Sequence, residues 1–230
     1  MSLEVLHADD HLVAVAKPPG RIVVPGRGAP ERTVREEAEA LLGPLWVVHR
    51  LDRGTSGVLL LARDADTHRT LCARFERHEV TKRYLALVRG VPSGDVRVDV
   101  PIAAGRRGRM RAGAGLPGAK PSSTFLRVVA AFPPGAALVE AFPASGRTHQ
   151  VRVHLAHAGH PLLVDPDYGD PGPWRGPGGQ VLLERTPLHA ASLEFLHPGT
   201  GKPLRVEAPL PPDMAEAVSA LRRDQASKSG

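Results

Sequence analysis

Cysteine is almost absent from this chain of 230 residues, because Cys72 is the only one and no internal disulfide can form. That scarcity fits a protein of the reducing cytosol. The apolar runs are also short, as at residues 58–62, and none could cross a bilayer. The N-terminus lacks a basic stretch followed by an apolar one, so no secretory signal is expected. We therefore expect a cytoplasmic protein without a membrane segment.

Acidic residues are missing from residues 101–139, although the whole chain contains 24 of them. The chain is basic, with a formal net charge of +6 and a pI of about 10.1, and a basic protein favours a polyanionic partner such as RNA. The alternative is a generally solvated basic surface. Because positive charge is concentrated here, we expect residues 105–120 to contact phosphates. The candidate contacts are Arg106, Arg107, Arg109 and Arg111.

The hydropathy pattern predicts many short strands with a few interleaved helices. We expect strands at residues 3–6, 12–16, 46–48, 58–62, 80–88, 97–100, 124–131 and 137–142, and near residues 181, 193 and 204. We expect helices at residues 31–42, 145–159 and 213–223, and a further helix that is capped by Asp64 or Asp66 and runs to about residue 77. Such a pattern indicates an α+β fold with a mixed, mainly antiparallel central sheet flanked by helices and loops. No linker divides the chain, so we expect one domain over residues 1–213 and a C-terminal helix with a polar tail over residues 214–230.

The segment HRLDRGTSG, residues 49–57, is a polar, glycine-containing loop between two apolar strands. This arrangement places polar groups at the rim of a core, where binding and catalytic residues often lie. Asp52 is the central candidate. From loop chemistry alone, however, Asp52 would be read as a residue that caps a turn and pairs with Arg50 or Arg53.

Residues 49–64, HRLDRGTSGVLLLARD, resemble the signature HRLDxxTSGLLLxA of the RluA family of pseudouridine synthases. Four further segments resemble family elements in the family's order. They are KPPG at residues 17–20, FERHEVTKRYLALVRG at 75–90, SGRTHQVRVHLAHAGHPLLVDPDYG at 145–169, and LHAASLEFLHPGTGK at 188–202. Five ordered elements are far more specific than one short motif, and together they cover about residues 3–213.

The resemblance implies a pseudouridine synthase catalytic domain that isomerises uridine in RNA without a cofactor. It implies that Asp52 is the catalytic carboxylate and that Arg152 pairs with it. It also implies that Tyr84 stacks on the base and helps to move the C5 proton. In isolation, Arg152 would be read as a surface helix residue and Tyr84 as a core residue. Whether Asp52 attacks the ribose, attacks the base or acts as a base stays open.

The same resemblance suggests further contacts with RNA. Arg50 is expected to fill the gap left by the flipped base, since a planar guanidinium suits stacking. Arg147 and Thr148 are expected at a helix start, where backbone N–H groups favour a phosphate. His49 and Arg53, which flank Asp52, complete the candidate set.

Three positions depart from the family pattern, although none is an expected catalytic residue. Val164 stands where the family usually has glycine, and Pro19 and Ser122 stand where it has alanine. The S4-type RNA-binding domain of many members is not expected here, since the chain starts at the catalytic domain. Recognition would then depend on loops of that domain, and the target, ribosomal or transfer RNA, stays open. We expect a monomer.

Three other readings compete with this one. A metal site could use the cluster His149, His154, His157 and His160, with Asp165 nearby, but no HExxH or CxxC spacing is present, so no metal is expected. A phosphate-binding loop at residues 113–120 lacks the contiguous Gly-Lys-Ser/Thr that such loops need. A non-catalytic RNA-binding or ribosome-assembly protein on the same fold is the third, and the trio of Asp52, Tyr84 and Arg152 argues against it.

Overall fold

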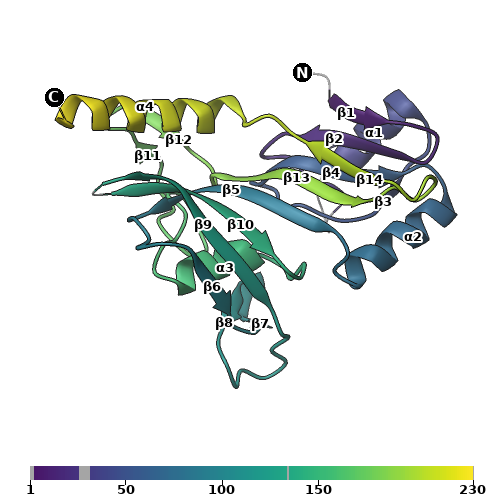
Figure 1. The fold of residues 1–230 in the computed structure, drawn as a ribbon, viewed down its shortest axis with the longest axis horizontal. Coiled ribbons are helices and arrows are strands. Elements are labelled where there is room, and N and C mark those ends of the chain that lie inside the picture. The colour runs from purple at the N-terminus through teal and green to yellow at the C-terminus, as the bar shows by residue number, and fades with distance from the viewer. Residues whose placement is uncertain (1–2, 26–31, 134, 230) are drawn as a thin grey trace. The chain divides into compact units, whose positions relative to one another are not determined.

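The computed structural model describes residues 3–25, 32–133 and 135–229, and it divides into two compact units (Figure 1). Unit 1 comprises Met1–Lys82 and Ala190–Pro209, and unit 2 comprises Arg83–His189 and Leu210–Gly230. Each unit is therefore built from two separate stretches of the chain. The architecture is α+β, as predicted, with sheet strands and, within the described ranges, four α-helices.

The sheet of unit 1 has β4 (Ser56–Ala62) at its centre. The strand order is β1 (Glu4–Ala8), β2 (Leu12–Lys17), β4 and β13 (Leu188–Leu196), while β3 (Trp46–Val47) pairs with β4 and β14 (Pro203–Glu207) pairs with β13. Every residue of β4 is buried, and its side chains alternate between two hydrophobic clusters. A strand covered on both faces reads as a continuous apolar run, which is why the sequence SGVLLLA shows no polar alternation.

Two helices, α1 (Val34–Leu42) and α2 (Ala65–Glu76), contribute to these clusters. Val34 and Ala38 of α1 join one cluster and Leu71 of α2 joins the other. Of the two predicted caps of α2, Asp64 is the one used, because its carboxylate accepts the N–H groups of residues 66 and 67. The predicted start of this helix, residue 31, lies outside the described residues, and residues 32 and 33, which were also predicted as helical, are not. Thr33 forms a capping box with Glu36, so the helix begins only after it.

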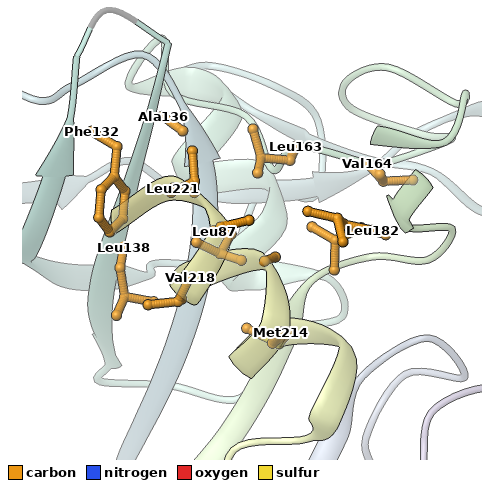
Figure 2. Close-up of a cluster of buried hydrophobic side chains, with 13 residues drawn as sticks. Leu87, Phe132, Ala136, Leu138, Leu163, Val164, Leu182, Met214, Val218 and Leu221 are labelled. Carbon is orange, nitrogen blue, oxygen red and sulfur yellow. The ribbon is translucent and has the colours of Figure 1, made fainter. Parts of the chain in front are cut away.

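The sheet of unit 2 has the strand order β5 (Thr81–Arg89), β10 (Ala136–Pro143), β9 (Ser123–Phe132) and β6 (Val96–Asp99), with antiparallel β5/β10, β10/β9 and β9/β6 pairs. Successive side chains of β5 point to opposite faces. Ala86 and Val88 pack in the cluster that includes α3 (Gln150–His157), whereas Leu87 packs in the cluster that includes α4 (Pro212–Ser229). Figure 2 shows this second cluster, with Leu87 beside Val218 and Leu221.

Helix α4 is longer than expected, because it runs to Ser229 rather than to residue 223. Its buried residues Met214, Ala217, Val218 and Leu221 recur at the spacing of one helical face. No helix among the described residues has the length and apolar character needed to span a membrane.

The basic segment forms a small hairpin within residues 102–112, where no strand was expected. It consists of β7 (Ile102–Ala104), β8 (Met110–Ala112) and a 3-10 turn at Arg106–Gly108. A second pair, β11 (Trp174–Arg175) with β12 (Val181–Leu183), places a strand at residues 174–175, where none was expected. Strands of two or three residues are too short to show a period of two, which explains both omissions.

Candidate active site

The loop that carries Asp52 is fastened to residues 17–20 in unit 1. The Gly20 N–H donates to the Arg53 carbonyl at 2.8 Å, and the Arg53 Nε–H donates to the Gly20 carbonyl at 3.0 Å. The buried Lys17 ammonium donates to the same Arg53 carbonyl at 3.2 Å and to the Pro18 carbonyl at 2.9 Å. Two family-like segments that are well separated in the sequence therefore meet around Asp52.

Asp52 lies at the boundary between core and solvent, as its motif predicted. Its carbonyl accepts the Thr55 N–H at 3.0 Å, which closes a tight turn. Leu51 and Thr55 on either side are buried, while Asp52 itself is partly exposed. The fold thus holds the backbone of this turn firmly and leaves Asp52 only partly covered.

His49 has a role inside the protein. Its Nε2 accepts the Leu60 N–H at 3.0 Å, so that nitrogen carries no proton, and its ring stacks on Phe75 with 4.9 Å between ring centroids. Burial and the nearby charge of Lys82 lower the pKa of His49 to about 4. The ring therefore supports the loop as a neutral group. Its contact with RNA remains a prediction, as does that of the two exposed arginines, Arg50 and Arg53.

Lys82 was not among the expected site residues. It is 7% exposed, and burial lowers the pKa of its ammonium group to about 8. The K-x-Y spacing in the family-like segment, with Tyr84 two residues later, was the only sequence signal that pointed to it. Tyr84 is partly buried on β5 and packs against the cluster around α3.

Arg152, on α3 of unit 2, is buried rather than on a helix surface. Its Nε–H donates to Asp165 at 2.9 Å, and one terminal nitrogen donates to Asp165 at 2.6 Å and to Asp167 at 2.8 Å. Two carboxylates from the loop after α3 thus hold one guanidinium. Asp52 belongs to unit 1 and Arg152 to unit 2, and their pairing stays a prediction.

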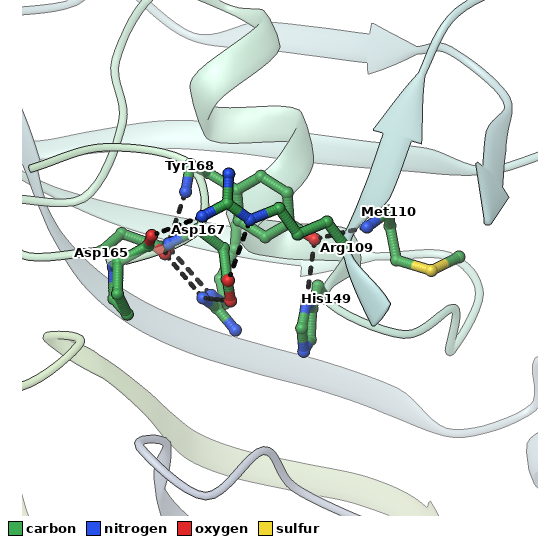
Figure 3. A network of polar contacts seen from close by, with 8 residues as sticks. Arg109, Met110, His149, Asp165, Asp167 and Tyr168 are labelled. Atoms are coloured by element: carbon green, nitrogen blue, oxygen red, sulfur yellow. Dashed lines mark hydrogen bonds and ion pairs between the residues drawn. The ribbon is translucent and has the colours of Figure 1, made fainter. Parts of the chain in front are cut away.

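Tyr168 completes this network and joins it to the basic hairpin. The Arg152 guanidinium lies 5.0 Å from the centroid of its ring. The Tyr168 hydroxyl accepts the Met110 N–H at 2.7 Å and forms a hydrogen bond with His149 Nδ1 at 2.8 Å (Figure 3). Arg109 of the hairpin pairs with Asp167 at 3.3 Å between Nε and a carboxylate oxygen.

The charges around Asp167 favour its ionised form. Burial opposes ionisation, but the hydrogen bond and charge of Arg152, assisted by His149 and Arg109, lower the pKa of Asp167 below its usual range. Asp165, Asp167 and Tyr168 belong to a family-like segment, but the sequence alone suggested no role for Asp167 or Tyr168, and it placed Asp165 only beside the histidines of the rejected metal site. Their positions in a loop give no periodic signal that could have linked them to Arg152.

The start of α3 differs from the expectation for Arg147 and Thr148. His149 has a left-handed backbone, with φ of 54°, so the helix begins at Gln150. The Arg147 N–H donates to the Gln150 side chain at 3.1 Å, so this amide is already satisfied. Arg106, Arg109 and Arg111 are exposed on the hairpin, and the side chain of Arg107 lies outside the described part.

The histidines of the α3 segment make contacts within unit 2. His154 is fully buried, and its ring nitrogens hydrogen-bond to Thr124 Oγ1 at 2.8 Å and to the Val100 carbonyl at 2.9 Å. Burial lowers the pKa of His154. His160 hydrogen-bonds to the Arg89 carbonyl at 3.0 Å. Over the ranges that the structure describes, no group of three or more His, Cys, Asp or Glu residues is placed to hold a metal ion.

The chain matches the family model described as RNA pseudouridylate synthase over residues 11–157, which is more than half of its length. The chain belongs to the RNA pseudouridine synthase family. It is 37% identical to the "Ribosomal large subunit pseudouridine synthase D" of Xanthomonas campestris pv. campestris, with 97% of this chain and 71% of that protein covered. It is 38% identical to the "Ribosomal large subunit pseudouridine synthase C" of Vibrio vulnificus, with 95% and 69% covered.

A solved structure agrees with these relatives. "Human RNA Pseudouridylate Synthase Domain Containing 4" is 29% identical, with a TM-score of 0.77 and coverage of 95% of this chain and 93% of that one. The predicted fold and the predicted class of enzyme, an RNA pseudouridine synthase, are thereby confirmed.

Proposed function

We propose that this RNA pseudouridine synthase modifies uridines of ribosomal RNA and that Asp52 is its catalytic carboxylate. The relatives named above act, by their names, on the ribosomal large subunit, which favours ribosomal over transfer RNA. The exposed arginines of the basic hairpin supply cations for phosphates. We expect the enzyme to work in the cytoplasm as a monomer and without a cofactor.

The reaction is an isomerisation, so no redox partner or group donor is needed. The N1–C1′ bond of the uridine breaks, the base turns, and a C5–C1′ bond forms. The proton lost from C5 is balanced by the one gained at N1. The target base must leave the stack before these steps, and Arg50 is proposed to fill the space that it leaves.

The observation that carries the proposal is the fixed turn around Asp52. Its backbone is held by Lys17 and Gly20 through the Arg53 carbonyl, and Asp52 as a residue is partly exposed. In the proposed complex, Arg152 keeps that carboxylate ionised. An ion pair at 4 Å contributes about 4 kcal/mol before desolvation at an effective dielectric constant of 20. Tyr84 stacks on the base and handles the C5 proton.

Replacement of Asp52 by asparagine tests this assignment. Asp52→Asn preserves size but removes the charge, so pseudouridine formation on ribosomal RNA transcripts should be abolished while folding and RNA affinity persist. Asp66→Asn is a matched control, because Asp66 is exposed on α2 and forms its ion pair with the exposed Arg69 of the same helix. Melting temperature, RNA affinity and pseudouridine yield should be measured on the same preparations.

Two outcomes would contradict the proposal. If Asp52 only stabilises a turn, the Asn variant loses about 1 kcal/mol of stability and keeps its activity. If the wild-type protein is inactive on both ribosomal and transfer RNA, a non-catalytic RNA-binding protein is favoured instead. Pseudouridine mapping across the RNA of a deletion strain would identify the modified uridine.

A further inference from the structure

Asp165 is the most completely buried carboxylate of the Arg152 network, with 0% of its surface exposed. Its two oxygens accept four N–H bonds. Two come from the Arg152 guanidinium, and two come from the backbones of Asp167 at 3.0 Å and Tyr168 at 3.2 Å. The Asp165 carboxylate is therefore held by backbone N–H groups of its own loop as well as by the guanidinium.

The geometry of this contact restricts the guanidinium strongly. A two-point contact between arginine and a carboxylate sets the plane of the guanidinium as well as its position. Asp165 contacts the Nε edge, and the ring of Tyr168 lies 5.0 Å from the guanidinium carbon. Asp167 adds a single contact and is the more exposed partner, with 30% of its side chain accessible against 1% for Asp165.

Backbone hydrogen bonds within the loop hold Asp165 in this position. The Asp165 N–H donates to the Asp170 carbonyl at 2.7 Å, and the Gly169 N–H donates to the Asp165 carbonyl at 3.0 Å. A Cβ at Gly169 would lie 3.2 Å from the Leu162 carbonyl oxygen, so a side chain there would require the neighbouring backbone to shift by a few tenths of an ångström. These contacts give a physical reason for the spacing of Asp165, Tyr168 and Gly169 in the D-x-x-Y-G sequence.

We propose that Asp165 is a positioning residue that fixes the Arg152 guanidinium for the reaction, and this inference rests on the proposed function. Asp165 acts through Arg152 and does not touch the substrate. A displacement of about 1 Å in a catalytic group can reduce a rate by about 100-fold. Loss of Asp165 should therefore slow the chemical step more than it weakens RNA binding.

Asp165→Asn is the direct test, because asparagine keeps the size and one oxygen but turns an NH2 group toward Arg152. We expect the single-turnover rate constant to fall by at least about 10-fold, with the RNA dissociation constant within about twofold of wild type. Asp170→Asn is the matched control. Asp170 lies in the same loop and pairs with Arg89 at 2.7 Å, and we expect its variant to react within about twofold of the wild-type rate.

A double-mutant cycle separates positioning from a general structural effect. Arg152→Lys keeps the charge but cannot make the two-point contact. If Asp165 acts through Arg152, adding Asp165→Asn to Arg152→Lys should cause no further loss of rate. A structural role would instead slow the double variant by the same factor as the single one, and that result would overturn the proposal.

Each remaining outcome is also decisive. A folded Asp165→Asn protein with the wild-type rate overturns the positioning role alone, whereas an inactive wild-type protein overturns the proposed function together with it. If Asp165→Asn does not fold, Asp165→Glu takes its place. Glutamate keeps the charge but displaces the guanidinium by its extra methylene group, so we expect a folded protein with a reduced rate, and an unchanged rate would refute the proposal.

Discussion

Any side chain at Gly57, the last residue of the HRLDRGTSG segment, should strongly destabilise the protein. Gly57 has a backbone φ of +119°, and it pairs with Lys17 at the start of β4. A Cβ built at this position would lie 2.2 Å from the Ala190 carbonyl oxygen and 2.7 Å from the Ala190 nitrogen. Both distances are shorter than real contacts of this kind, and the opposing atoms belong to the backbone of β13, which cannot rotate away.

The cost of Gly57→Ala has two parts. The positive φ costs a residue with a side chain about 1–3 kcal/mol. Forcing a methyl group into closely packed backbone costs about 1–3 kcal/mol more. Gly20→Ala isolates the first part, because Gly20 has a φ of +80° and no atom within 4 Å of its Cβ position. We therefore expect Gly57→Ala to destabilise the protein by about 4 kcal/mol and Gly20→Ala by about 1 kcal/mol.

Urea denaturation monitored by circular dichroism measures this difference, because the midpoint shifts in proportion to the lost stability when the slope is unchanged. The two variants should be compared at one protein concentration and temperature. If Gly57→Ala unfolds at the same urea concentration as Gly20→Ala, the close approach of β4 and β13 does not limit this position, and the reasoning fails.

Three further predictions concern the reaction, RNA binding and pH. Tyr84→Phe should lower the single-turnover rate by about 100-fold with little change in RNA affinity, and a wild-type rate would leave Tyr84 only a stacking role. Changing the exposed Arg106, Arg109 and Arg111 to glutamine should flatten the salt dependence of RNA affinity by about one unit of log–log slope for each phosphate that is no longer neutralised, whereas an unchanged slope would exclude the hairpin from the interface. Burial lowers the pKa of Lys82 from 10.5 to about 8 in the folded protein. Between these values the unfolded chain binds more protons, so the free energy of unfolding should rise by about 2 kcal/mol from pH 8 to 10. Lys82→Met should remove this rise, and an equal rise in the variant would assign it to other groups.

The elements that the sequence predicted well are those with strong local signals. The apolar run of β4 and the Asp64 cap of α2 fix their elements without help from distant residues. The start of α1 was missed although its signal was present, since Thr33 and Glu36 have the spacing of a capping box. By contrast, no local sequence signal predicts the left-handed backbone of His149, because of which α3 begins only at Gln150.

The site could be predicted only in part, for a related reason. A motif identifies residue types, as it did for Asp52 and Arg152, but it does not say which groups surround them. The inward stacking of His49 on Phe75 depends on how the loop meets α2. The fixation of Arg152 by Asp165 depends on a loop that returns to α3 after the helix has ended. Contacts of this kind follow from tertiary structure and leave no period in the sequence.

The interleaved order of the two units has a consequence for synthesis on the ribosome. Unit 1 is not complete until Ala190–Pro209 has emerged, because Leu193 and Phe195 belong to the same cluster as Leu12 and Leu60. Until then, the nascent N-terminal segment exposes apolar surface that only a late strand can cover, and contacts between such distant residues form slowly. Unit 2 must likewise wait for α4. We therefore expect neither unit to fold stably before α4 has been released from the ribosome, so the nascent chain would depend on chaperones until then.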